Sequence, residues 1–235
     1  MKDAFVAVLG APEGIVLFQL LDATRFTIAL SLIAFTGGGL VAALVTLVRI
    51  QPARRLAALG GAYVWLFQSV PLLMLLFLSG LGVPRLLGVD VDIWLAATLS
   101  LTLYTSAYLA EVWRGAIEAV PAGQREAGRA LGLSFARILR LIVLPQAIRL
   151  GVAPTVGFMV QIIKGTSLAY IIGFHDLMTV GKRWANAPVP GTEPFVIYPL
   201  MALIYFALSF PLTRYARFLE RRLGTAAKQP MPMAS

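Results

Sequence analysis

The chain has 235 residues, no cysteine, 59% hydrophobic residues and only 13% charged residues, whereas a soluble domain carries about 45–50% apolar and about 25% charged residues. This composition excludes a disulfide framework, a zinc–thiolate site and a cysteine nucleophile, and it favours a bundle of membrane-spanning helices. The net charge of +9 fits either nucleic acid or an anionic membrane as a partner, so the positions of the charges must decide between them.

Five segments with at most one charge are long enough to cross a bilayer, because about 20 apolar residues at about 1.5 Å each span its hydrocarbon layer. In chain order they are Phe26–Val48, Leu56–Pro84, Ile93–Ala110, Leu150–Phe174 and Pro194–Thr213. A backbone that crosses lipid must satisfy its own hydrogen bonds, which a helix does within one segment. The sequence therefore predicts an all-α integral membrane protein with five transmembrane helices.

The distribution of basic residues predicts how the chain is oriented. One alternating set of loops, at 49–55, 111–149 and 214–235, carries 14 of the 20 Lys and Arg residues and four of the 11 acids. Cytoplasmic loops carry the excess of Lys and Arg. We therefore expect the N-terminus outside and the C-terminus inside. This distribution accounts for the basic character of the chain, and no nucleic-acid partner is predicted.

The flanking segments differ from the transmembrane domain, which we place at 23–222. Residues 1–22 begin with an apolar stretch between Asp3 and Glu13, and we expect this segment to lie in the interface on the outer face. Residues 223–235 are small, polar and proline-containing, as is typical of a cytoplasmic tail.

The longest predicted cytoplasmic loop, 111–149, has the pattern of two short helices joined by a tight turn. Pro121 suits the first turn of a helix, and Gly132 suits a left-handed residue that ends it. Ser134 can cap the next helix, and Pro145 is expected to break that helix before it enters the membrane. The residues alone therefore predict a cytoplasmic helical hairpin.

Two other interpretations of this hairpin deserve comparison. A DNA-reading helix–turn–helix needs polar side chains at the start of its second helix, whereas Ser134–Ala136 is nearly apolar and the helix runs into a predicted span. DNA reading is therefore disfavoured. The residues alone do not exclude a hairpin that lies at the membrane interface without any partner.

The spacing of residues in the hairpin resembles the EAA loop of ATP-binding-cassette (ABC) importer permeases. The family pattern is Glu-Ala-Ala, three residues, Gly, nine residues, Ile, one residue and Leu-Pro. The matching residues are Glu126, Ala127, Gly128, Gly132, Ile142, Leu144 and Pro145, with Gly128 in place of the second Ala. The resemblance implies that a loop of about 114–147 docks in a groove on a separate ATPase subunit.

Other segments resemble the polar amino acid branch of this family, the histidine, glutamine, glutamate and arginine type. They are 108–115, 120–124, 164–168, 171–173 and Pro71–Leu73, and the resemblance runs from about residue 22 to 222. The chain has Gln68–Val70 where the branch has Arg-Gly-Thr, and Leu75 where Gln is common. These departures leave the transported amino acid open, with glutamate, aspartate or glutamine as candidates.

The resemblance implies a set of partners and a location. The partners are ABC ATPase subunits, a second copy or a homologous permease, an extracytoplasmic solute-binding protein, membrane lipid and an amino acid substrate moved by alternating access. The location is the bacterial cytoplasmic (inner) membrane. The chain has no phosphate-binding loop of the form Gly-x4-Gly-Lys-Ser/Thr. We therefore expect no enzyme activity, no metal and no cofactor on this chain, with ATP and Mg on the partner ATPase.

Lys164 is a charge near the middle of a predicted span, where insertion costs roughly 2.5–3.5 kcal/mol. Such a residue normally faces protein or a water-filled path, and the polar residues Thr166 and Ser167 follow it. In one interpretation the three residues line the substrate path, where Lys164 pairs with a substrate carboxylate. In the other they form a structural polar cluster that joins helices.

Three alternative functions remain for comparison. A non-catalytic membrane anchor or assembly subunit predicts no dependence on Lys164. An ABC permease for another small zwitterionic solute, such as an opine or an ectoine-like compound, has the same architecture. An integral membrane enzyme needs a catalytic constellation, and the sequence offers none.

Overall fold

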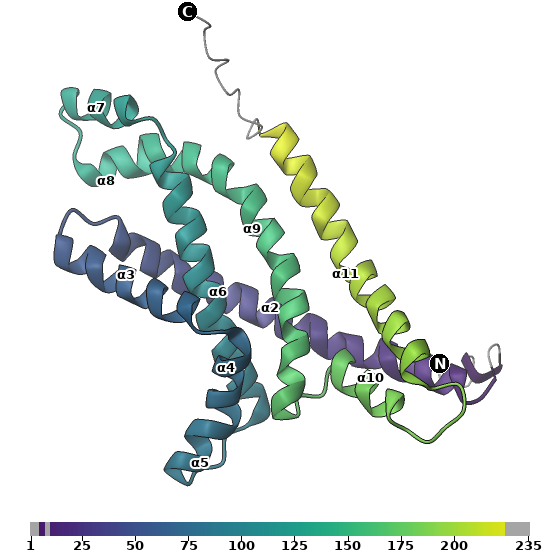
Figure 1. Ribbon diagram of the computed structural model, residues 1–235. Helices are drawn as coiled ribbons and strands as arrows, with labels where there is room; N and C mark the ends of the chain where they lie inside the picture. Colours follow the sequence, from purple (N-terminus) through teal and green to yellow (C-terminus); the bar gives the residue numbers. More distant parts are fainter. Residues whose placement is uncertain (1–4, 8–9, 224–235) are drawn as a thin grey trace, which may run out of the picture.

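A computed structural model describes residues 5–7 and 10–223 (Figure 1), and every regular element in this part of the chain is helical. The helices are α2 (Glu13–Arg49), α3 (Arg54–Ser69), α4 (Leu72–Phe77), α5 (Val83–Leu87), α6 (Ile93–Glu118), α7 (Ala122–Ala130), α8 (Phe135–Ile138), α9 (Leu144–Thr166), α10 (Leu177–Ala185) and α11 (Pro194–Arg222). The predicted all-α fold is confirmed.

Four continuous helical runs are long and apolar enough to cross a membrane: α2, α6, α11 and the run Phe135–Ile172 that contains α9. The second predicted span is instead a bent pair, in which Arg54–Ser69 and Leu72–Leu87 meet at 93°. Pro71 explains the bend, because proline lacks an N–H and disfavours helical backbone in the preceding residue. Val70 is accordingly extended, with φ −93° and ψ 125°. The five predicted spans are thus four continuous helices and one bent pair.

The predicted helix break at Pro145 is wrong. The helical run continues from Phe135 to Ile172, with a π-helical turn over Leu139–Val143 directly before Pro145, which lies in the first turn of α9. A π turn adds one residue to the helical turn where the proline ring would otherwise clash with a preceding carbonyl. The hairpin is therefore continuous with a transmembrane helix.

The first span begins earlier than expected, because α2 starts at Glu13 and residues 13–22 run without a break into the predicted span. At about 1.5 Å per residue, α2 is roughly 55 Å long, well over the roughly 30 Å of a hydrocarbon core. Its early residues Val16, Leu20 and Ala23 pack with α10 and α11. The interfacial position of this extension stays a prediction. Residues 1–4, 8–9 and 224–235 of the two predicted flanking segments lie outside the described residues.

The long helices cross one another around a common core (Figure 1). α2 packs against both α6 and α9. A Cβ on Gly38 would lie 2.4 Å from Thr105 Cγ2, so a glycine is required where α2 and α6 approach. The core also includes residues of α4 and of the 3-10 helix Ser167–Ile172.

The hairpin and α10 lie at opposite ends of α6 and α9 (Figure 1). The hairpin, α7 and α8, is at the end where α11 finishes, and α10 is at the end where α2 begins. The start of α2 and the end of α11 therefore lie at opposite ends of the bundle (Figure 1).

Candidate functional site

The turn of the hairpin is built around a left-handed glycine. Gly132 has φ +73°, its N–H donates to the Arg129 carbonyl at 2.9 Å, and the Leu133 N–H donates to the Gly128 carbonyl at 3.1 Å. These two bonds satisfy carbonyls at the end of α7, as predicted for a glycine stop. Ser134 holds the predicted N-cap position of α8, but its hydroxyl makes no capping hydrogen bond.

Gly128 brings the two helices of the hairpin together. It is buried, and a Cβ there would lie 2.9 Å from Ile138 Cγ1 and 3.0 Å from Ile142 Cδ1. The close approach that a small residue permits at this position is therefore made within the hairpin. The glycine that departs from the family pattern is matched to two isoleucines on the facing segment.

An apolar cluster fixes the hairpin to the membrane helices. The cluster joins the end of α6 to α8 and α9, and its buried members are Ala116, Ile117, Val120, Ile138, Val143 and Ala147. Arg125 adds a polar tie, since its Nη2 donates to the Ile117 carbonyl at 2.8 Å. The hairpin is therefore packed onto both α6 and α9.

The outward surface of the hairpin combines polar and large apolar side chains. Glu126, Ala127 and Gly132 are exposed. Leu131, next to the turn, is 78% exposed and Phe135 is 44% exposed. Sequence reasoning missed these two residues, although apolar side chains beside a glycine stop in a charged loop are a usable signal.

The remaining residues of the EAA pattern lie inside the hairpin or where it joins the membrane helix. Ile142 and Leu144 are half-buried, and Pro145 is exposed at the start of α9. The pattern therefore divides into an outward set at 126, 127 and 132 and a set that shapes the hairpin and its junction at 128, 142, 144 and 145.

A network of ion pairs holds the end of α2 on α6 near the hairpin. Glu111 pairs with both Arg49 and Arg114, and Arg114 also pairs with Glu118. Arg114 Nε donates to Glu111 Oε1 at 3.1 Å. Sequence reasoning missed this network. The three α6 residues have the spacing of side chains on one helix face, but Arg49 is far away in sequence.

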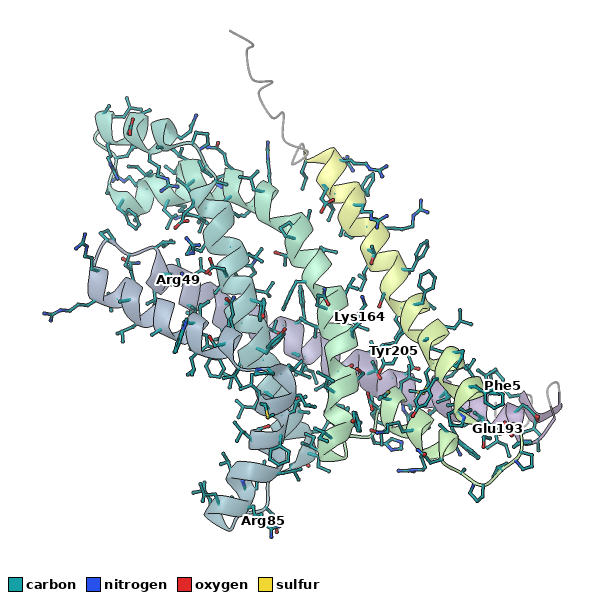
Figure 2. All side chains as sticks on the ribbon, viewed as in Figure 1. Phe5, Arg49, Arg85, Lys164, Glu193 and Tyr205 are labelled. Atoms are coloured by element: carbon teal, nitrogen blue, oxygen red, sulfur yellow. The ribbon has the colours of Figure 1, made fainter. Side chains whose placement is uncertain are left out.

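Thr166 does not share a helix face with Lys164, whereas Ser167 follows Lys164 by about one turn. Lys164 is exposed near the end of α9 (Figure 2), as is Gln161 one turn earlier. Ser167 donates its hydroxyl to the Lys164 carbonyl at 2.6 Å. Thr166 is fully buried and donates to the Ile163 carbonyl at 2.8 Å. The exposed polar side of α9 is therefore formed by Gln161 and Lys164, and Thr166 packs into the protein.

A buried polar cluster joins α10 to its neighbours. Asp176 is fully buried and caps α10 by accepting from the Thr179 N–H at 2.9 Å. The Tyr205 hydroxyl donates to Asp176 at 3.5 Å, and Thr27 accepts from the Leu177 N–H at 3.2 Å. Burial raises the pKa of Asp176 above its ordinary value. Sequence reasoning missed this cluster, although an Asp before an apolar helical segment is a capping signal.

The site holds no group of side chains suited to a metal: within residues 5–7 and 10–223, no three His, Cys, Asp or Glu residues gather closely enough. The class of protein follows from the geometry described so far. It is a membrane protein whose helices carry an attached hairpin with an exposed, partly apolar surface, as a subunit driven by another protein requires.

Comparison with known proteins identifies the family. Residues 36–225 match the model of the binding-protein-dependent transport system inner membrane component. A probable glutamine ABC transporter permease protein of Bacillus subtilis is 32% identical over 86% of this chain and 92% of its own length. An arginine transport system permease protein of the same organism is 28% identical over 87% of this chain and 92% of its own length.

A solved structure agrees with these relatives. The crystal structure of an amino acid ABC transporter with histidines superposes with a TM-score of 0.80 at 26% identity, and it covers 87% of this chain and 94% of the other. The chain belongs to the family of binding-protein-dependent transport system inner membrane components. The resemblance predicted from the EAA pattern is confirmed. The chain is an integral membrane permease subunit without catalytic activity, and the ATPase is a separate chain.

Proposed function

We propose that this chain is the permease subunit of an ATP-driven importer that moves polar amino acids across the bacterial cytoplasmic membrane. The relatives named for glutamine and arginine transport support this substrate class. The observation that carries the proposal is the hairpin with its EAA pattern, which is fixed to α6 and α9 and has an exposed outer surface. The N-terminus lies outside and the hairpin inside.

The hairpin couples the membrane helices to the ATPase subunits, which hold ATP and Mg. Glu126 and Ala127 face the ATPase, and Leu131 fills an apolar depression on it. Gly132 shapes the turn. The remaining pattern residues, Gly128, Ile142, Leu144 and Pro145, hold the hairpin rigid and join it to α9. When the ATPase subunits approach each other on binding ATP, they carry the hairpin, and α6 and α9 follow.

The substrate path follows the exposed polar side of α9. Lys164 pairs there with the substrate carboxylate, Gln161 and Ser167 supply polar contacts that replace water, and Thr166 supports the helix from its buried side. A second copy or a homologous permease completes the path. An extracytoplasmic solute-binding protein delivers the amino acid at the end where α10 lies.

The direct test is transport in proteoliposomes that contain the permease, its ATPase and its solute-binding protein. Uptake of labelled glutamine, glutamate, aspartate and arginine is measured with and without ATP. The proposal predicts ATP-dependent uptake of at least one of the four. A complex that assembles and hydrolyses ATP but transports none of them, while it transports another zwitterionic solute, contradicts the proposed substrate class.

Two matched pairs of variants test the assigned roles. Gly132→Arg should abolish stimulated ATP hydrolysis, whereas Gly123→Arg places the same side chain on α7, where a Cβ meets nothing within 4 Å, and should keep it. Lys164→Met should lower uptake at least tenfold without loss of assembly, whereas Lys182→Met, on α10, should not. Equal uptake by wild type and Lys164→Met would show that Lys164 has a structural role and does not bind the substrate.

A further inference from the structure

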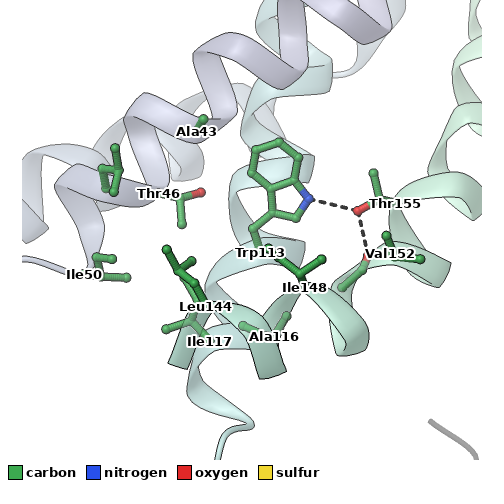
Figure 3. A pocket seen from close by; sticks show the side chains of 13 residues that line it. Ala43, Thr46, Ile50, Trp113, Ala116, Ile117, Leu144, Ile148, Val152 and Thr155 are labelled. Atoms are coloured by element: carbon green, nitrogen blue, oxygen red, sulfur yellow. Dashed lines mark hydrogen bonds between the residues drawn. The ribbon is translucent and has the colours of Figure 1, made fainter. Parts of the chain in front are cut away.

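An apolar cavity of about 380 Å³ lies between α2, α6 and α9, near the end that carries the hairpin (Figure 3). Its few polar side chains already have partners in the protein. Trp113 Nε1 donates to Thr155 Oγ1 at 2.9 Å, and that hydroxyl donates to the Gly151 carbonyl at 2.7 Å. Thr46 donates to the Ala110 carbonyl at 3.4 Å. The cavity therefore offers its occupant an apolar surface.

A second cavity, of about 430 Å³, lies between the end of α2, the end of α6 and the hairpin. Its charged lining consists of three arginines, Arg49, Arg125 and Arg129, and one carboxylate, Glu118. We call this the basic cavity. Arg49 and Glu118 are already committed to the ion-pair network of α6. Arg125 and Arg129 therefore decide what charge the cavity can accept.

These two guanidinium groups have unused hydrogen-bond donors. Arg125 Nη2 is bound to the Ile117 carbonyl, but its Nε is buried with no hydrogen-bond partner within the described structure. Arg129 is exposed and has no ion pair among residues 5–7 and 10–223. Two arginine side chains that line one cavity without an ion pair favour an anion, and the planar fork of arginine matches a phosphate.

The two cavities adjoin each other, because Ile50 and Ile117 line both. The shared wall lies where α2 ends and α6 approaches the hairpin, at the junction between the membrane helices and the cytoplasmic loop. On one side the lining is apolar and on the other it is basic. A free anion would leave the apolar cavity unfilled, and an apolar protein segment would leave the arginines without an anionic partner. A molecule with an anionic head and a hydrocarbon tail fits both.

The apolar cavity is separate from the exposed polar side of α9. The cavity is lined on α9 by Leu144, Ala147, Ile148, Gly151, Val152 and Thr155. At about 100° per residue, the mean direction of these residues and that of Gln161 and Lys164 are roughly 140° apart around the helix. An occupant of the cavity is therefore not the transported solute in transit.

We propose that the two cavities together bind one anionic phospholipid of the cytoplasmic leaflet. Its phosphate is held by Arg125 and Arg129, and one acyl chain fills the apolar cavity beside Trp113. Anionic lipids of that leaflet attract basic residues next to the membrane helices. The bound lipid joins the hairpin to α2 and α6, so its occupancy stiffens the element that contacts the ATPase. The proposal rests on the cytoplasmic position of the hairpin given under Proposed function.

Lipid binding is measured on the full chain alone, without an ATPase or solute, so that a failure here is distinguishable from a failure of the transport proposal. The detergent-purified chain is titrated with dioleoylphosphatidylglycerol, dioleoylphosphatidylcholine and inorganic phosphate, and bound ligand is counted by native mass spectrometry. We expect phosphatidylglycerol to bind at least tenfold more tightly than phosphatidylcholine, and phosphate to bind far more weakly than the lipid. Equal binding of the two lipids, or phosphate binding as tight as the lipid, overturns the proposal.

Matched variants locate the bound lipid. Arg129→Gln should weaken phosphatidylglycerol binding at least tenfold, whereas Arg137→Gln, on α8 and outside both cavities, should not. Ala43→Trp fills the apolar cavity and should also weaken binding. Leu44→Trp adds the same ring to the neighbouring exposed position and should leave it unchanged. Binding that survives both Arg129→Gln and Ala43→Trp overturns the assignment.

The competing occupant is a second copy of the chain, and the absence of cysteine makes that testable. In Ala43→Cys the introduced cysteine is the only one in the protein. The lipid proposal predicts that oxidation in native membranes gives no disulfide-linked dimer at this position. A dimer formed through Ala43→Cys shows that protein covers the cavity and overturns the proposal.

Discussion

Gly132 allows the coupling role of the hairpin to be tested with a calculable perturbation. Its φ is +73°, and a Cβ there would meet no atom within 4 Å. The cost of a substitution therefore comes from the backbone and not from crowding. A left-handed conformation costs a residue with a side chain roughly 1–2 kcal/mol. Gly132→Ala should raise the fraction of opened hairpins by about 5- to 30-fold, since 1.4 kcal/mol is about a factor of ten.

Two further variants control for the change in composition. Gly123→Ala lies near the start of α7, where a Cβ also meets nothing within 4 Å and the backbone is helical, so it should stabilise the hairpin by up to about 1 kcal/mol. Gly132→Asn should cost less than Gly132→Ala, because Asn tolerates the left-handed conformation. The expected order of hairpin stability is Gly123→Ala, wild type, Gly132→Asn and Gly132→Ala.

Hydrogen exchange of the hairpin amides measures this order. The Leu133 N–H, bound to the Gly128 carbonyl, should exchange fastest in Gly132→Ala, and the stimulation of ATP hydrolysis in the complex should fall in parallel. Equal exchange in Gly132→Ala and Gly123→Ala would refute the assigned backbone role. Full stimulation despite faster exchange would refute the claim that the shape of the hairpin carries the coupling.

Three other predictions concern packing and charge. Gly181→Ala should lower the unfolding free energy by about 1–3 kcal/mol, because its Cβ would lie 2.0 Å from Met201 Sδ, and the loss should shrink when Met201→Ala is also present. Glu111→Gln should cost about 1–3 kcal/mol by leaving Arg49 without its carboxylate, as measured by thermal unfolding in detergent. Asp176→Ala should cost about 1 kcal/mol through the lost cap, whereas Asp176→Asn should retain the cap.

The controls and pH dependence of these variants follow from the same structure. Glu126→Gln, at an exposed position, should change the melting temperature far less than Glu111→Gln does. The pKa of Asp176 is raised above its ordinary value of 3.8. The folded protein therefore binds the proton on Asp176 more tightly than the unfolded chain does. Wild-type stability should fall as pH rises through the raised pKa, and Asp176→Asn should lack this component. The same fall in stability with rising pH in Asp176→Asn would contradict the assignment of this pH dependence to Asp176.

The features that could be predicted from the sequence depend on residues close together in the chain. The spans follow from uncharged segments because hydrocarbon thickness fixes the required length. Gly132 follows because a left-handed stop is a local feature. The position of Thr166 was within reach too, since residues two apart on a helix point roughly 200° apart and cannot share a face with Lys164.

The features that were missed depend on distant residues or on competing local effects. Arg49 pairs with Glu111 across 62 residues of sequence, and the burial of Gly128 depends on Ile138 and Ile142. The effects of Pro71 and Pro145 were not predicted correctly. Pro71 bends the second span by 93°, whereas a π turn accommodates Pro145. The effect of a proline thus depends on its structural surroundings, since Pro199 and Pro211 lie inside α11, which continues as an α-helix through both.

The most direct test of the coupling claim is site-specific crosslinking in the assembled transporter. Since the native chain has no cysteine, Ala127→Cys on the exposed side of the hairpin and Asn186→Cys, just past α10, each provide a single reactive thiol. With benzophenone maleimide, whose maleimide alkylates the thiol and whose benzophenone inserts into a neighbouring C–H bond on irradiation, the account predicts a crosslink to the ATPase subunit from position 127 and none from position 186. A transport-competent complex that crosslinks from position 186, or fails to crosslink from 127 while the thiol remains reactive, would contradict it.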